Sequence, residues 1–69
     1  MIHPFAVVDE NAFLGTETDV WHGAFVGAYT RTGSRCCIGS CVCVCPNCTL
    51  GNDVRIQNGS FIPAGSVLG

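Results

Sequence analysis

A repeat of six residues runs through the whole chain. Every sixth residue from Ile2 to Leu68 is aliphatic except Thr32, which is β-branched. The residue two places before each of these is small or β-branched, and a glycine often follows the aliphatic residue, as Gly15 follows Leu14. A period this short, kept in register to the last residues, predicts a solenoid rather than an ordinary globular fold.

The repeat predicts an all-β prism of short strands. Side chains two residues apart share one face of a strand, so the aliphatic and small columns point inward together. Glycine after the aliphatic residue indicates a tight turn. No stripe of helical period is present. If three sides close one coil, residues 1–69 form a single domain of about four parallel coils. These coils would cover residues 2–19, 20–37, 38–55 and, in part, 56–69.

Composition predicts self-association and excludes some other partners. Only 12% of the residues are charged and 48% are hydrophobic, whereas about 25% are charged in an average protein. A small, apolar chain of this kind is expected to cover part of its exterior with copies of itself. The net charge is −2, which argues against a nucleic-acid or anionic membrane surface. No apolar run is long enough to cross a membrane.

Six cysteines lie between residues 36 and 48. The N-terminus has no basic region typical of a secretory leader, so we expect a cytoplasmic protein with reduced thiols. The repeat points Cys36 and Cys48 inward as small hydrophobes, while Cys37 and Cys43 face outward on different sides. Zinc needs four converging ligands, and the register scatters these thiols, so no metal site is predicted.

Several hexads resemble a known family. The segments LGTETD, VGAYTR, IGSCVC, LGNDVR and IPAGSV resemble the hexapeptide repeats of left-handed parallel β-helix acyltransferases. The N-terminal segment, with His3, Trp21 and His22, and the later Gln57 and Asn58 are similar to the early coils of bacterial N-acetyltransferases that act on UDP-linked amino sugars. The resemblance implies a left-handed coil, acetyl-CoA as co-substrate, and trimers with active sites between subunits.

The chain also departs from these enzymes. In the family, the catalytic asparagine or histidine and much of the acetyl-CoA groove lie in coils after the one that matches Gln57 and Asn58. We therefore expect a truncated or minimal relative with weak activity at best. The alternative is a non-catalytic oligomeric module with a structural or binding role. A third alternative is a metal enzyme of the same fold, which would need three histidines converging between subunits. This chain has two, on the same corner; a threefold axis could supply one from each copy, but nothing in the sequence demands it.

Stacking by eighteen residues gathers imidazole, indole and amide groups on one corner of the prism. A histidine of near-neutral pKa is the usual general base for acyl transfer to an amine, so His22 is the candidate catalytic residue. The substrate-binding candidates on the same corner are His3, Trp21, Gln57 and Asn58. The alternative is that both histidines are solvated corner residues and that the indole covers the edge of a coil.

One of the columns of outward-facing side chains, stacked eighteen residues apart, is apolar. It consists of Val7, Phe25, Cys43 and Phe61. Apolar side chains gathered outside a solenoid predict a covered surface, and we expect this column to be the interface of a homotrimer. Unpaired strand edges at the C-terminal end of the stack also favour end-to-end association.

Overall fold

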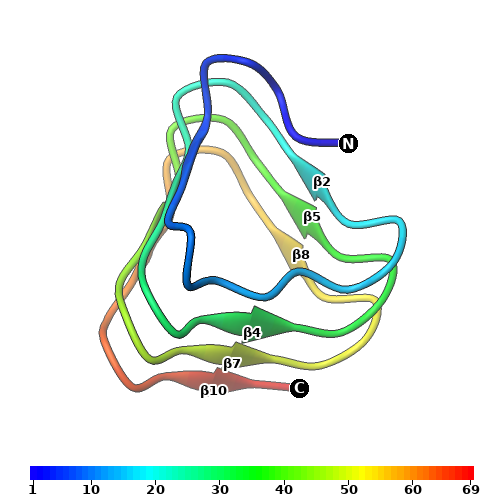
Figure 1. Cartoon of the computed structure of the whole chain (residues 1–69), viewed down its shortest axis with the longest axis vertical. Coiled ribbons are helices and arrows are strands. Elements are labelled where there is room, and N and C mark those ends of the chain that lie inside the picture. The colour runs from blue at the N-terminus through cyan, green and yellow to red at the C-terminus, as the bar shows by residue number, and fades with distance from the viewer.

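The structure is a computed structural model that describes residues 1–69 and contains ten short strands and no helix. Figure 1 shows a triangular coil, with β2, β5 and β8 labelled on one side and β4, β7 and β10 on another. Each strand has two residues: β1 (Val7–Val8), β2 (Asp19–Val20), β3 (Phe25–Val26), β4 (Arg31–Thr32), β5 (Cys37–Ile38), β6 (Cys43–Val44), β7 (Thr49–Leu50), β8 (Arg55–Ile56), β9 (Phe61–Ile62) and β10 (Val67–Leu68). The structure contains no helix that is long and apolar enough to cross a membrane.

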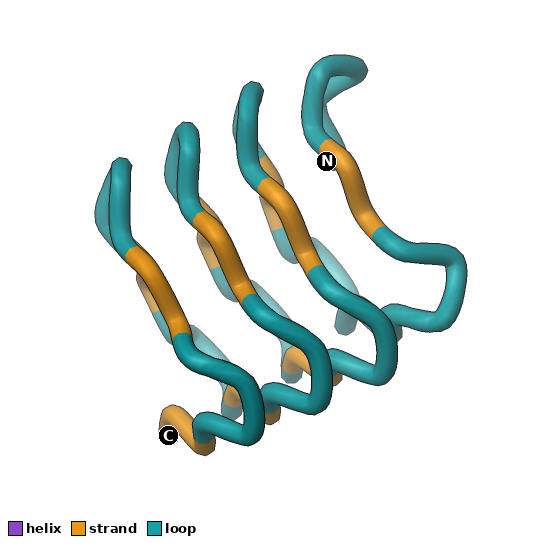
Figure 2. The backbone as a smooth tube through the Cα atoms, turned by 90° about the vertical axis from the view of Figure 1, so that its left-hand side faces the viewer, coloured by secondary structure: helices purple, strands orange, loops and turns teal.

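The strands form three parallel sheets, one on each side of the prism. Their orders are β1-β3-β6-β9, β2-β5-β8 and β10-β7-β4. Isolated bridges from Ile2 to Val20 and from Phe13 to Arg31 extend the two shorter sheets into the first coil. Every pairing joins residues eighteen apart, as Val26 pairs with Val44. The predicted parallel β-helix is thus confirmed, with three complete coils and a partial fourth, which Figure 2 shows side by side.

The coil is left-handed. In Figure 1 the chain proceeds anticlockwise as it recedes from the viewer, from the N-terminal coil in front to the C-terminal coil behind. Crossovers between parallel strands are right-handed in most proteins. The sequence period alone does not specify the hand, whereas the resemblance to the hexapeptide-repeat family implied it.

The two inward columns form the core. Val20, Val26, Ile38 and Val44 are fully buried, and the small residues of the second column pack between them. Thr18 and Thr30 are buried in that second column, and their hydroxyls donate to carbonyl oxygens fifteen residues later in the chain. No buried polar side-chain atom lacks a hydrogen-bond partner. The predicted inward pattern is confirmed.

The glycines that follow the aliphatic residues were expected to allow tight turns, but the structure gives another reason for them. The positive φ angles fall two residues later in the hexad, on every sixth residue from Glu17 to Gly65. Gly33 and Gly39 themselves have ordinary φ angles, but a Cβ on either would collide with the side-chain oxygen and the backbone nitrogen of an asparagine in the next coil. At Gly33 and Gly39, glycine is therefore required by the close approach of the next coil.

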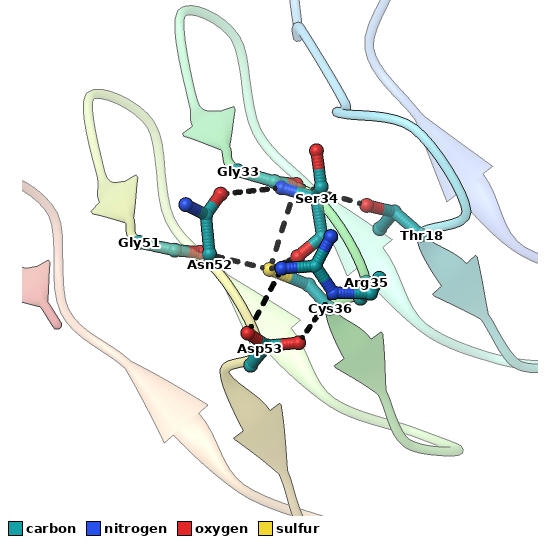
Figure 3. A network of polar contacts seen from close by, with 8 residues as sticks. All are labelled: Thr18, Gly33, Ser34, Arg35, Cys36, Gly51, Asn52 and Asp53. Atoms are coloured by element: carbon teal, nitrogen blue, oxygen red, sulfur yellow. Dashed lines mark hydrogen bonds and ion pairs between the residues drawn. The ribbon is translucent and has the colours of Figure 1, made fainter.

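Polar contacts link successive coils at their corners. In Figure 3, Ser34 N–H donates to Asn52 Oδ1 at 2.8 Å, and Arg35 Nε and Nη2 contact the two carboxylate oxygens of Asp53 at 2.8 and 3.1 Å. All four residues lie on the corner between β4 or β7 and the next strand. These contacts repeat the eighteen-residue register outside the core and fix the stacking of the coils.

Candidate functional site

The candidate site lies on the corner that follows β2, β5 and β8, which we call the polar corner. It is formed by residues 3–5, 21–23, 39–41 and 57–59 in the four coils. The turn in the second coil is closed by a hydrogen bond from Ala24 N–H to the Trp21 carbonyl oxygen at 3.2 Å. Trp21 N–H also donates to the Ile38 carbonyl oxygen at 3.0 Å. The backbone that carries His22 is therefore held at both ends of the turn.

Three side chains form a ladder along this corner. Ser40 Oγ lies 3.3 Å from His22 Nδ1, and Ser40 N–H donates to Asn58 Oδ1 at 2.8 Å. The next residue, Cys41, donates its N–H to the His22 carbonyl oxygen at 3.1 Å. The Asn58 amide thus supports the turn that holds Ser40, and Ser40 contacts the imidazole of His22.

His3 lies beside His22 in the preceding coil. The two ring centroids are 5.6 Å apart and the rings are inclined at 60°. His3 Nδ1 accepts a hydrogen bond from Phe5 N–H at 3.1 Å, so the proton of a neutral His3 ring is on Nε2. No carboxylate contacts either imidazole. The polar corner can accept a proton, but it offers no acid that would orient His22.

The five residues predicted for the site share this corner but differ in what they contact. His3 and His22 are neighbours, and Asn58 reaches His22 through Ser40. Trp21 and Gln57 lie on the same corner without a side-chain hydrogen bond, and the indole is 39% exposed. The eighteen-residue register places Ser40 beside His22 in the stack, as expected from the sequence, but it did not predict the contact between Ser40 Oγ and His22 Nδ1.

The apolar column lies on the sheet next to the polar corner. The register pairs Phe25 with Val7 and Cys43, and Cys43 with Phe61. Val7 and Phe61 are 58% and 63% exposed, and Phe25 is 40% exposed. The predicted column therefore exists as a continuous exposed strip. Nothing in the structure shows what covers it.

Charged residues are distributed unevenly around the prism. No charged residue occurs in residues 20–30, 36–52 or 56–69. These stretches include the sheet β1-β3-β6-β9 and its two flanking corners in every coil after the first. We call this surface the uncharged face. The charged residues are Asp9, Glu10, Glu17, Asp19, Arg31, Arg35, Asp53 and Arg55.

A hollow occurs elsewhere, at the N-terminal end of the sheet that contains β4. It has a volume of about 340 Å³ and is lined by Phe13, Leu14, Gly15, Arg31 and Thr32. The Arg31 guanidinium carbon lies 5.8 Å from the centre of the Phe13 ring. The polar corner has no hollow of its own within one copy of the chain. A substrate pocket at that corner would therefore need additional walls.

The comparisons with known proteins agree with this architecture. The family model for the bacterial transferase hexapeptide (six repeats) matches residues 29–69. Among solved structures, the acetyltransferase domain of PglB from Neisseria gonorrhoeae FA1090 is similar, with a TM-score of 0.87 and 28% sequence identity. The match covers 88% of this chain but 30% of that chain, so the sequence spans less than a third of that structure. No curated protein matches the sequence significantly.

Proposed function

Because the chain belongs to the bacterial transferase hexapeptide family, which matches more than half of its length, we propose that it acts as an acetyl-CoA-dependent N-acetyltransferase-type solenoid. The proposed acceptor is the amine of a nucleotide-linked amino sugar. The similar acetyltransferase domain supports acetyl transfer. The observation that carries the proposal is the contact between His22 Nδ1 and Ser40 Oγ, beside an uncharged face.

His22 would serve as the general base. If the Ser40 oxygen accepts the Nδ1 proton, the Nε2 lone pair of His22 is free to take a proton from the attacking amine. The new carbon–nitrogen bond forms as the thioester carbon–sulfur bond breaks, and the imidazolium returns its proton to the leaving thiolate. His3 and Trp21 would bind the acceptor on the same corner, together with Gln57 and Asn58.

The chain offers a surface that suits the pantetheine arm of acetyl-CoA but no cation that would meet its phosphates. The uncharged face next to the polar corner, with Phe25 and Phe61, suits the neutral pantetheine arm. No cation lies on that face to meet the phosphates, because the three arginines are on other parts of the prism. Within one copy, the corner also lacks a hollow. We therefore propose that a homotrimer packed through the uncharged face completes the site and that the isolated chain turns over slowly.

Acetyl transfer to UDP-linked amino sugars, followed by mass measurement of the product, tests this function. His22→Ala should reduce turnover by about 100-fold or more, the usual contribution of a general base. Thr49→Ala, an exposed change on β7, is the matched control and should retain activity. Turnover unchanged in His22→Ala would contradict the role of His22.

A second candidate function is a non-catalytic oligomeric module. It is favoured by the extent of the uncharged face and by the absence of a hollow and of a carboxylate partner at the polar corner. An acetyl-CoA titration separates the two candidates. A trimer that binds no acetyl-CoA would support the module, whereas binding that is weakened by Phe25→Lys would support the transferase.

A further inference from the structure

One backbone hydrogen bond of the repeat is missing at Thr32. The residue after each inward aliphatic residue donates its N–H to a carbonyl oxygen seventeen residues later, as Gly33 donates to Leu50 at 2.9 Å. The N–H of Gly15 instead donates to the hydroxyl of Thr32, Oγ1, at 2.9 Å. Thr32 is the one residue of its column that is not aliphatic. Its carbonyl oxygen is therefore left without the donor that its equivalents have, although backbone carbonyls are strong acceptors.

This irregularity lies in the hollow of about 340 Å³, which Thr32 lines together with Phe13 and Arg31. An isolated bridge pairs Phe13 with Arg31, and the guanidinium carbon lies 5.8 Å from the centre of the ring. Arg31 makes no ion pair, whereas Arg35 pairs with Asp53. The hollow thus brings together an aromatic ring, a cation without a carboxylate and a carbonyl oxygen without its usual donor.

The hollow is separate from the polar corner and from the uncharged face. The polar corner joins the sheets β2-β5-β8 and β1-β3-β6-β9, and the hollow lies on the third sheet, which contains β4 (Figure 1). A trimer packed through the uncharged face would leave this third sheet open. Phe13 is 59% exposed, so a ligand can reach the hollow from solvent.

The groups that line the hollow select a class of ligand. A guanidinium presents a planar fork of donors that matches a carboxylate, and a carbonyl oxygen accepts from an ammonium. An α-amino acid carries both groups on one carbon, and an apolar side chain would cover Phe13. The protein has a net charge of −2, which disfavours a simple anion, whereas a zwitterion has no net charge. We propose that the hollow binds a free amino acid with an apolar side chain.

An NMR titration with three related ligands tests the proposal. L-phenylalanine should bind saturably, with a Kd of about 1 mM, and should shift the signals of the Gly15 amide and of Arg31 Nε–H. 3-Phenylpropionate lacks the ammonium and 2-phenylethylamine lacks the carboxylate. Each should bind at least about tenfold more weakly, because it leaves one polar group of the hollow without a partner.

Two variants and a control assign the contacts. Arg31→Gln removes the cation and should weaken the binding of L-phenylalanine at least about tenfold. Arg55→Gln removes the same charge from β8, on another sheet, and should bind like the unmodified chain. Thr32→Val removes the hydroxyl, so the Gly15 N–H should return to the carbonyl oxygen, as elsewhere in the repeat. This variant should bind L-phenylalanine and 3-phenylpropionate equally, because the acceptor for the ammonium is taken.

Each contrary result would contradict a stated part of the proposal. The absence of saturable shifts with L-phenylalanine, or unchanged binding by Arg31→Gln, would overturn the site. Equal binding of L-phenylalanine and 3-phenylpropionate by the unmodified chain would overturn the amino acid as the ligand, and a preference that persists in Thr32→Val would remove the role of the Thr32 carbonyl. Circular dichroism should show that the variants keep the fold. Acetyl transfer plays no part in this readout, so its absence would leave the hollow standing as a binding site.

Discussion

The thiol of Cys36 donates to the carbonyl oxygen of Gly51 at 3.0 Å, from within the core. Cys48 makes the same contact with Pro63 at 3.2 Å, and Thr30 makes it with the Cys45 carbonyl oxygen at 3.2 Å. In all three, the acceptor lies fifteen residues after the donor. The buried cysteines thus occupy a threonine position, and the sequence-based interpretation of them as small hydrophobes was incomplete.

This relationship predicts how the core responds to two substitutions of nearly equal size. Cys36→Thr keeps a donor for Gly51, whereas Cys36→Val removes it. The threonine variant should be more stable than the valine variant by about 1 kcal/mol, the net value of a hydrogen bond. Urea unfolding monitored by circular dichroism measures the difference. Equal stability of the two variants would show that the contact contributes nothing.

A second prediction concerns the glycines after the aliphatic residues. A Cβ on Gly39 would lie 2.8 Å from the Asn58 backbone nitrogen and 2.9 Å from the Ile56 carbonyl oxygen. Gly39→Ala should therefore separate two coils and destabilise the fold by about 1–3 kcal/mol, as overpacking does. Thermal unfolding provides the measurement.

The control for this prediction is Gly59, which has φ +77° and open space around it. Gly59→Asn should change stability little, because asparagine tolerates the left-handed region. A larger loss in Gly59→Asn than in Gly39→Ala would mean that backbone conformation, and not the approach of coils, governs these positions.

The hexad register was sufficient to predict the three sheets, the inward columns and the strip from Val7 to Phe61. Those features depend on which face of a strand each residue occupies, and a period of six specifies that for every residue. Membership of the polar corner followed from the same register, so His3, His22 and Asn58 were correctly grouped.

Contacts that depend on side-chain rotamers and on the neighbouring coil were not predictable in this way. The Ser40 contact with His22, the donation from Cys36 to Gly51 and the crowding at Gly39 each join two coils at a distance that the period does not give. The hollow near Phe13 and Arg31 lies at the first coil, where an isolated bridge pairs these two residues, and a uniform repeat contains no sign of it.

A third prediction concerns the contribution of the Arg35–Asp53 ion pair to stability as the pH falls. The hydrogen bonds from Arg35 lower the pKa of Asp53 below its ordinary value. A carboxyl whose pKa is lowered by folding stabilises the protein above its unfolded pKa, and this contribution is lost as the pH falls through the folded pKa. The effect on overall stability should be small and weakened by salt, because both side chains are exposed.

Arg35→Gln should raise the Asp53 pKa toward its ordinary value, as followed by carboxyl-carbon NMR during an acid titration. Arg31→Gln is the matched control, since Arg31 contacts the Phe13 ring instead. An Asp53 pKa that stays low in Arg35→Gln would assign the shift to another cause.

The last prediction tests the uncharged face. Placing lysines at Phe25 and Phe61 puts two positive charges in the middle of the surface proposed to pack against other copies. Burying them there would require desolvation without a partner. Phe25→Lys/Phe61→Lys should sediment as a monomer under conditions in which the unmodified chain is a trimer.

Phe13→Lys/Val67→Lys makes the same change of charge on the sheet containing β4 and β10, at side chains that are 59% and 77% exposed. The control should remain a trimer, because net charge is equal in the two variants and only the face differs. Dissociation of both variants would point to general repulsion, and persistence of the trimer in Phe25→Lys/Phe61→Lys would remove the uncharged face as the interface.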